Sequence, residues 1–360
     1  MRNLASIKVV SKLMPIEGKD RIELAIIDGW QVIVKKGEFQ EGAKCVYVEI
    51  DSVLPEKPEF EFLRSKNFRI KTIKMGGVIS QGICFGLDIL PPGRNYNVGQ
   101  DVTQILGIKQ YEPTMDIQKE PKTTASAKAK YPKFLMRMKW FRKAVSISNK
   151  KDSRAFPQFI KKTDETRIQN MPAILKDKAP YVCTEKIDGQ SGTFCLIKHK
   201  FLWTTKYEYI VCSRNLRLWD KDNSSYWKVS DRYKIESALK DMIGDNKWVA
   251  IQGECIAPNV QGNKYEVSEA DLYVFNVIYP SGRMGSVEAA SIIEKENMKF
   301  VPIINSSYVL PDTVPEVLEY AHGQSMIGNT LREGIVFRSQ DGSKSFKAVD
   351  PLFLLKYDEQ

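Results

Sequence analysis

The sequence Tyr181-Val-Cys-Thr-Glu-Lys186-Ile-Asp188-Gly189-Gln190-Ser191 decides how the rest of the chain is interpreted. Its aromatic and β-branched start predicts a strand that ends at Lys186, and Asp188-Gly189 predicts a tight turn into a second strand, Ser191 to Ile197. A lysine at a strand end, beside an aspartate and a glycine, is well placed to act as a nucleophile. Its amine must be neutral to attack, so its pKa has to be lowered by burial, a metal ion or a second cation. The same residues also fit an ordinary hairpin with a surface lysine.

Further motifs along the chain decide between these interpretations. The first stretch resembles motif I, Lys-x-Asp-Gly, of the covalent nucleotidyltransferases, the superfamily of ATP-dependent DNA and RNA ligases and mRNA capping enzymes. Five more motifs follow in the order of that superfamily over about 160 residues, each at a predicted strand or strand end, which is a specific signal. They are Ser213-Arg214-Asn215 (Ia), Gln252-Gly253-Glu254 (III), Leu272 to Val277 (IIIa), Glu333 to Arg338 (IV) and Ser345-Phe346-Lys347 (V).

Residues 1–107 alternate apolar and polar positions in short runs separated by turn residues, which predicts a small closed β-barrel. The phrases Gly29 to Glu38 and Tyr47 to Pro55 resemble the OB-fold domain that one branch of RNA ligases carries in front of its catalytic domain. An OB barrel binds nucleic acid through a basic, aromatic-bearing face. The basic candidates are Lys35, Lys36, Arg69, Lys71 and Lys74, each of which also fits a solvated outward strand position.

A basic segment separates the two predicted domains. Residues 119–162 hold 14 Lys/Arg and 2 Asp/Glu, whereas the whole chain has a net charge of +10, so the positive charge belongs to this segment. Residues 108–155 are predicted to be a linker, with a short basic amphipathic helix at 131–143. Such a helix fits three uses: gripping RNA phosphates, lying on an anionic membrane surface, or packing on a neighbouring domain.

The remaining residues, 156–360, show strands and helices in alternation, which fits the two-sheet nucleotidyltransferase fold with its site between the sheets. The fold class predicted for the whole chain is therefore α+β: an N-terminal OB-fold β-barrel followed by a nucleotidyltransferase domain. Asp164 and Glu165 suit the first turn of a helix, where they complement its dipole. Later helices are expected at Arg232–Met242, Val287–Glu296 and Val314–Gly323.

The resemblance implies roles for the motif residues. Lys186 would take AMP from ATP, and Lys347 would contact the α-phosphate. Asp188, Glu254 and Glu333 are hard oxygen ligands suited to Mg²⁺ or Mn²⁺, and Glu254 alternatively contacts the ribose hydroxyl. The resemblance also places Glu185 and Phe275 at the nucleotide, where Phe275 is either a ring that stacks on adenine or a core aromatic. It places Arg214, Arg167 and Gln169 at phosphates. Arg167 and Gln169 fit packing on a helix surface equally well.

Motif V departs from many relatives. It is often Lys-x-Lys, but Ser345 occupies the first lysine position here. Lys344 is one residue away and can substitute only by changing strand face. The sequence therefore leaves open which of Lys344 and Lys347 contacts the leaving pyrophosphate.

The resemblance implies an ATP-dependent RNA ligase that seals 3′-OH and 5′-phosphate ends, with RNA on the 3′-OH side of a nick as the preferred substrate. The OB-like domain comes first and about a dozen residues follow Lys347, whereas DNA ligases and capping enzymes place an OB domain after motif V. We therefore expect the OB-first RNA ligase branch. The alternatives are a GTP-dependent capping guanylyltransferase and a catalytically inactive RNA-binding protein of the same fold.

Composition supports an intracellular protein. The six cysteines form no CxxC pair and there are only two histidines, so we expect buried reduced thiols and not a zinc site. No signal peptide or membrane span is expected, because no window approaches the roughly 20 apolar residues that a span needs. These observations predict a cytoplasmic or nuclear protein, and we expect a monomer.

Overall fold

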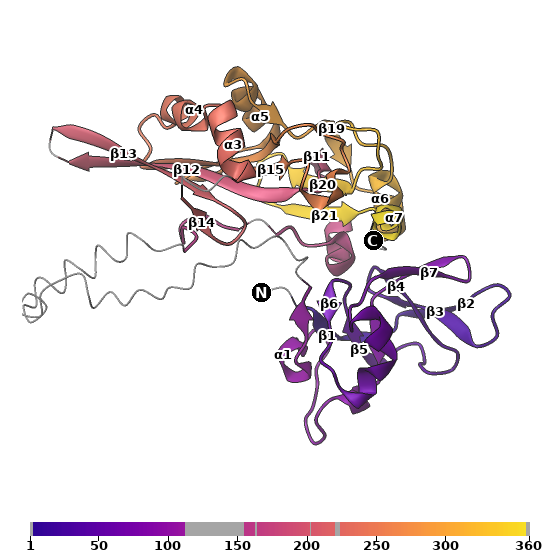
Figure 1. Ribbon diagram of the computed structural model, residues 1–360. Helices are drawn as coiled ribbons and strands as arrows, with labels where there is room; N and C mark the ends of the chain where they lie inside the picture. Colours follow the sequence, from indigo (N-terminus) through magenta and orange to yellow (C-terminus); the bar gives the residue numbers. More distant parts are fainter. Residues whose placement is uncertain (1–2, 112–154, 163, 202, 220–223, 358–360) are drawn as a thin grey trace, which may run out of the picture.

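The computed structural model describes residues 3–111, 155–162, 164–201, 203–219 and 224–357. Figure 1 shows two parts, an N-terminal one in indigo to purple and a C-terminal one in magenta to yellow, joined through residues that the structure does not describe. The predicted basic helix at 131–143 and most of the predicted linker lie outside the described residues. The proposed domain boundaries at 107 and 155 therefore stay predictions.

The N-terminal part is built from short antiparallel strands around one apolar core. Its alternation is clear in the strand that starts at Trp30, where Trp30, Val32 and Val34 are buried and Lys35 is exposed. The strands pair as β1-β5-β9, β2-β3-β4, β7-β8 and β6-β10. Their bounds are β1 Ala5–Val9, β2 Lys12–Pro15, β3 Ile22–Ile27, β4 Trp30–Lys35, β5 Lys44–Val48, β6 Ser52–Val53, β7 Thr72–Met75, β8 Val78–Gln81, β9 Ile83–Phe85 and β10 Lys109–Gln110, with helix α1 at Thr103–Leu106.

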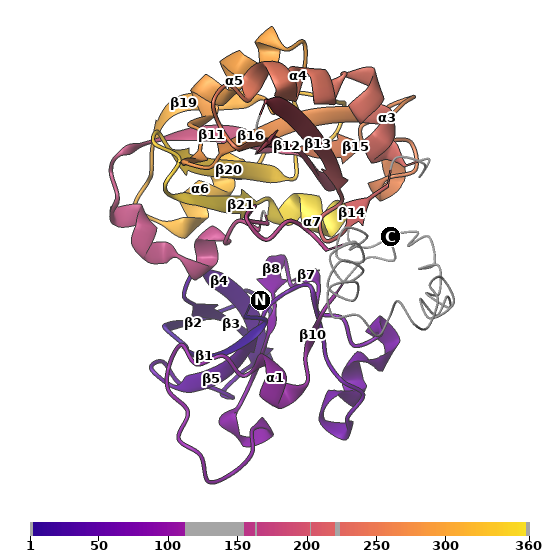
Figure 2. The same cartoon turned by 90° about the vertical axis from the view of Figure 1, so that its left-hand side faces the viewer.

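The C-terminal part contains two sheets, as predicted. One has four strands in the order β19-β11-β20-β21, and the other has seven, β14-β13-β12-β15-β16-β17 with β18 beside β16. Figures 1 and 2 show α3, α4 and α5 covering one face of the larger sheet. The strands are β11 Pro180–Lys186, β12 Gln190–Phe201, β13 Thr204–Cys212, β14 Arg217–Leu218, β15 Trp248–Ile256, β16 Asp271–Tyr279, β17 Gly282–Arg283, β18 Lys299–Phe300, β19 Ile303–Val309, β20 Gly334–Ser339 and β21 Ser345–Val349.

The three helices predicted after residue 230 are present, and one of them needs a correction. The helix expected at Arg232–Met242 is wrong at its start, because Lys234 adopts a left-handed conformation (φ 48°) that separates two helices. The helix at 314 begins with a capping box between Thr313 and Glu316, which fixes its first turn. The bounds are α3 Ser225–Arg232, α4 Ile235–Met242, α5 Ser286–Lys295, α6 Val314–Ala321 and α7 Pro351–Tyr357.

Two further expectations can be compared with the structure. All six cysteines are buried and unpaired, which confirms the predicted buried thiols. Within the described part of the chain, every helix is too short or too polar to cross a membrane.

Candidate active site

Lys186 lies where the chain passes from one sheet to the other. It ends β11 in the four-stranded sheet, and β12 begins in the seven-stranded sheet, so Asp188-Gly189 is a crossing between sheets and not a hairpin turn. Gly189 is required there because a Cβ atom would lie 2.5 Å from the carbonyl oxygen of Cys255 on β15. The close approach of the two backbones places Lys186 between the sheets.

Strand register brings two glutamates to Lys186. Gly334 lies opposite Lys186 in the β11–β20 pair, and the preceding Glu333 places its Oε2 2.5 Å from Lys186 Nζ. Glu254 lies opposite Ser191 in the β12–β15 pair, just beyond the crossing. Its carboxylate acts electrostatically on Lys186, as does that of Asp188. Four residues predicted from three separate motifs therefore meet at one place.

The excess of carboxylates controls the ionisation of this cluster. Burial lowers the pKa of Lys186, but the charges of Glu333 and Glu254 outweigh it, so the pKa of Lys186 is raised. Burial raises the pKa of Glu254 to about 8, although Lys186 opposes the shift, and burial also raises the pKa of Glu333. The lowered lysine pKa that nucleophilic attack requires is therefore not a property of the protein alone, and it needs additional positive charge at the cluster.

Two neighbouring residues that the sequence did not single out hold Asp188. Lys264 Nζ forms an ion pair with the carboxylate of Asp188 and also donates to the carbonyl of Gln261 at 3.0 Å. The hydroxyl of Tyr265 accepts a hydrogen bond from the Asp188 backbone N–H at 2.8 Å. We call Lys186, Asp188, Glu254, Glu333 and Lys264 the Lys186 cluster.

Lys347 lies next to this cluster, on β21, and its charge acts on Glu333. Its Nζ is 3.2 Å from Asp164, which also lies 3.5 Å from Arg214. Motif residues Lys347 and Arg214 thus face the same carboxylate. Lys344 points elsewhere, because its Nζ contacts Asp177 at 2.5 Å.

Ser345 joins a second cluster, in which Arg338 is buried and the other members are half-buried. Its hydroxyl donates to Glu165, whose carboxylate also lies 3.3 Å from Arg283 and 3.5 Å from Arg338. The prediction of a helix first turn at Asp164 and Glu165 is wrong, since a short 3₁₀ helix begins only at Ile168. The two carboxylates bind cations of β17, β20 and β21 instead of capping a helix. We call Glu165, Arg283, Arg338 and Ser345 the Glu165 cluster.

Phe275 and Glu185 have distinct surroundings. Phe275 is the extra residue of a β-bulge, because Gln252 pairs with Asn276 and Gly253 with Val274. A bulge re-aims a side chain, and the half-buried ring of Phe275 packs at the edge of the core. Glu185 is buried and accepts hydrogen bonds from Ser325 Oγ and the Met326 N–H, so it holds the loop before motif IV.

Arg167 and Gln169 lie at the interface with the N-terminal part. Arg167 Nη2 is 3.1 Å from Asp51 Oδ2, and the backbone of Gln169 accepts a hydrogen bond from Gly29. The adjacent Asn170 accepts from Trp30 Nε1 at 2.7 Å. Their predicted contact with phosphates stays a prediction.

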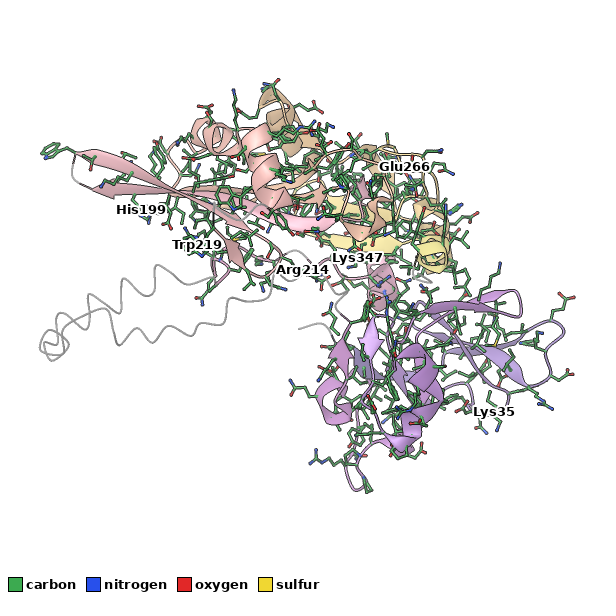
Figure 3. All side chains as sticks on the ribbon, viewed as in Figure 1. Lys35, His199, Arg214, Trp219, Glu266 and Lys347 are labelled. Atoms are coloured by element: carbon green, nitrogen blue, oxygen red, sulfur yellow. The ribbon has the colours of Figure 1, made fainter. Side chains whose placement is uncertain are left out.

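The basic candidates of the N-terminal part are dispersed. Arg69 stacks on the ring of Tyr111, with its guanidinium carbon 3.6 Å from the ring centre. Lys35, labelled in Figure 3 together with Lys347, lies on the far side of the N-terminal part from the candidate active site. Lys36 and Lys74 are exposed, and Lys71 is half-buried.

The Lys186 cluster has the oxygen ligands that a hard divalent cation prefers. Asp188, Glu254 and Glu333 supply carboxylate oxygens, and the pKa of Glu254 is raised first by burial and then by the charges of Glu333 and Asp188, which a cation would neutralise. In the described ranges, no three acidic, histidine or cysteine side chains already converge as a ready metal site. The residues therefore fit a hydrated ion reached partly through water better than a fully protein-coordinated one.

Comparison with known families matches both parts of the chain. Residues 179–357 match the RNA ligase family model, and residues 4–87 match an OB-fold domain model. The second match confirms the fold predicted for the N-terminal part. No curated protein sequence matches the chain.

Solved structures of an RNA ligase from Naegleria gruberi resemble the whole chain. The complex with PPi has a TM-score of 0.82 and 29% sequence identity, and the match covers 100% of both chains. A mutant of the same ligase with AMP and Mn also has a TM-score of 0.82 and 29% sequence identity, with 100% of both chains covered. Another mutant, with ATP and Mn, has a TM-score of 0.81 and 28% identity over 99% of this chain and 100% of that one.

Proposed function

The chain belongs to the RNA ligase family, and on that premise we propose that it seals 3′-OH and 5′-phosphate ends of RNA through an adenylated Lys186. It is an ATP-dependent ligase of the nucleotidyltransferase superfamily, as the motifs predict. The observation that carries the proposal is the position of Lys186 between two sheets, 2.5 Å from Glu333 and next to Lys347. ATP, AMP and Mn occur in the complexes of the Naegleria ligase, which supports ATP as the donor and Mg²⁺ or Mn²⁺ as the metal.

Three transfers account for the reaction. In the first, Lys186 Nζ forms a bond to the α-phosphorus of ATP, the bond to the β-phosphate oxygen breaks, and pyrophosphate leaves. Glu333 is placed to accept the proton that the amine loses. In the second, a 5′-phosphate oxygen takes the AMP from Lys186. In the third, the 3′-OH attacks the adenylated phosphate, a phosphodiester forms, and AMP leaves.

The residues around Lys186 act by positioning and charge neutralisation, which supply most of the catalysis in phosphoryl transfer. Lys347 neutralises the α-phosphate and, of the two lysines in motif V, is the one beside Glu333. Asp188, Glu254 and Glu333 would hold the divalent ion, which supplies positive charge that favours a neutral Lys186. Arg214 binds substrate phosphate, and Phe275 stacks on adenine. Glu185 supports the nucleotide site by holding the loop before motif IV through Ser325 and Met326. The proposed substrate is a nick with RNA on the 3′-OH side, and the proposed enzyme is a cytoplasmic or nuclear monomer.

The test is protein labelling by α-labelled ATP, with GTP in parallel, in the presence of Mg²⁺ or Mn²⁺. Covalent label from ATP that stays on the denatured protein in alkali and is released by acid, as a lysine–phosphorus bond requires, is expected in the wild type and in Lys344→Ala, and none in Lys186→Ala. Label from GTP alone would indicate capping chemistry. Absence of label with either nucleotide and either metal would leave an RNA-binding protein and overturn the proposal. Sealing rates on nicked duplexes that carry either RNA or DNA on the 3′-OH side then show which of the two strands the enzyme joins.

A further inference from the structure

The β-ribbon formed by β12 and β13 extends beyond the helices that cover the larger sheet (Figure 1). Residues 198–207, at its outer end, include three lysines and no acidic residue. Trp203, at the tip, is 96% exposed. An exposed aromatic ring beside lysines fits a surface that stacks on bases and binds phosphates.

The register assigns the lysines of the ribbon to two faces. Lys206 lies opposite His199, so both project from one face, whereas Lys200 lies opposite Thr205 and projects from the other. Lys198 shares the face of Lys200 and donates to the carbonyl of Gly244 at 2.8 Å, just after α4. The face of Lys200 therefore turns toward α4, and the face of Lys206 turns away from it.

The face of Lys206 leads toward the active site past Ile160, which packs on Cys195, Ile210 and Cys212 of the same face. His199 and Arg217 both contact Glu208, at 3.2 and 3.0 Å, and Arg217 stacks on Trp219. The turn before β14 carries Arg214, which shares Asp164 with Lys347. Figure 3 shows His199, Trp219, Arg214 and Lys347 along one side of the catalytic domain, from the ribbon to the active site.

We propose that the β12–β13 ribbon binds the RNA at a distance from the ends being joined, with Lys206 contacting a backbone phosphate and Trp203 stacking on a base. This inference rests on the proposed function and adds the position of the substrate strand. Phosphates attract Lys206 on this face, and the exposed ring of Trp203 at the tip offers a stacking surface that is indifferent to sequence.

The length of the ribbon sets the size of the bound RNA. β12 starts at Gln190, next to the active-site crossing, and runs to Phe201. At about 3.3 Å per residue the tip lies at most roughly 35 Å from the site, which corresponds to roughly ten nucleotides. Only substrates with an arm of that length reach Trp203.

The test measures equilibrium binding, against salt concentration, of two nicked RNAs: one with arms of about 6 base pairs, and a long-armed one in which about 10 unpaired nucleotides continue the arm and offer free bases for stacking. For the long-armed RNA, Lys206→Glu and Trp203→Ala are each expected to weaken binding at least about fivefold. Lys206→Glu should also reduce the salt slope by about 1. For the short-armed RNA, both variants should bind like the wild type.

The matched control is Lys200→Glu, which makes the same charge change on the same ribbon but on the face turned toward α4. It should leave binding of the long-armed RNA within about twofold of the wild type, since it is off the proposed path. An unchanged melting temperature shows that each variant is folded.

Equal losses for Lys206→Glu and Lys200→Glu, equal losses for both arm lengths, or no loss at all would overturn the proposal and leave the ribbon to another partner. Failure of the proposed function is detected separately, because it appears as a wild-type protein that takes no label from ATP.

Discussion

The Lys186 cluster and the Glu165 cluster lie in the same domain and both enclose charged side chains, but their charge balance is opposite. In the first, two lysines face three carboxylates, and burial raises the pKa of Glu254 to about 8. In the second, one carboxylate faces Arg283 and Arg338, and burial lowers the pKa of Arg338 to about 10.

The two clusters therefore serve different purposes. The surplus of carboxylates at Lys186 costs stability in the free protein and fits a site that receives a cation and a nucleotide. The Glu165 cluster joins the segment before motif I to β17, β20 and β21, because Glu165 contacts residues of all three strands. Asp164 and Lys347 lie between the clusters and connect them.

Removing the central carboxylate of the Glu165 cluster should have the largest effect. Glu165→Ala leaves Arg338, which is 3% exposed, without its carboxylate. Breaking a buried ion pair in this way is expected to lower the free energy of unfolding by about 3–5 kcal/mol. Urea unfolding measures it, with Asp164→Ala as the control, because Asp164 is considerably more exposed. If the control lost as much stability, the Glu165 cluster would not be the principal anchor of this segment.

Lys347→Ala separates catalysis from stability at the point where the clusters meet. Loss of one cation beside a developing phosphate charge should slow formation of lysyl-AMP by about 10²–10³-fold. The melting temperature should change little, because the contact of Lys347 with Asp164 reaches the surface. Single-turnover labelling with ATP gives the rate. A rate within a few fold of the wild type would remove Lys347 from the reaction.

The sequence predicted the Lys186 cluster better than the Glu165 cluster. Lys186 ends β11, Glu254 lies within β15 and Glu333 precedes β20, each in a motif of fixed order, so local patterns locate them. Lys264 is in an aperiodic stretch after β15, and its contact with Asp188 depends on how that stretch folds back. Glu165 and Arg338 are 173 residues apart, and no local pattern links such a pair. Arg167 and Gln169 fit either a phosphate or a packing role because interfaces between domains leave no periodic signal.

Glu254→Gln should remove the pH dependence of stability that Glu254 contributes. The usual pKa of 4.5 is raised to about 8 in the folded protein, so the folded state keeps a proton that the unfolded chain releases between these values. Stability should therefore fall as pH rises from about 4.5 to about 8. Glutamine carries no such proton.

The free energy of unfolding of the variant, relative to that of the wild type, should therefore rise by about 1–2 kcal/mol when the pH is raised from about 5 to about 8.5. This figure is smaller than the full pKa shift implies, because Glu254 is partly exposed to solvent. Urea unfolding at the two pH values checks it, with Glu61→Gln on the exposed surface of the N-terminal part as the control. Parallel stability curves for wild type and Glu254→Gln would show that Glu254 is ionised in the folded protein at neutral pH.

Lys344→Ala should have the smallest effect and settle the question that motif V leaves open. The Lys344 side chain is 56% exposed and contacts Asp177, which raises the pKa of Lys344 through their hydrogen bond. Solvent screens such a pair, so its removal should leave the unfolding midpoint unchanged. Because Lys344 lies just before β21 and contacts Asp177, whereas Lys347 contacts Asp164, label from ATP should also form at the wild-type rate. A loss comparable to that of Lys347→Ala would mean that Lys344 leaves Asp177 when ATP binds and contacts the departing pyrophosphate itself.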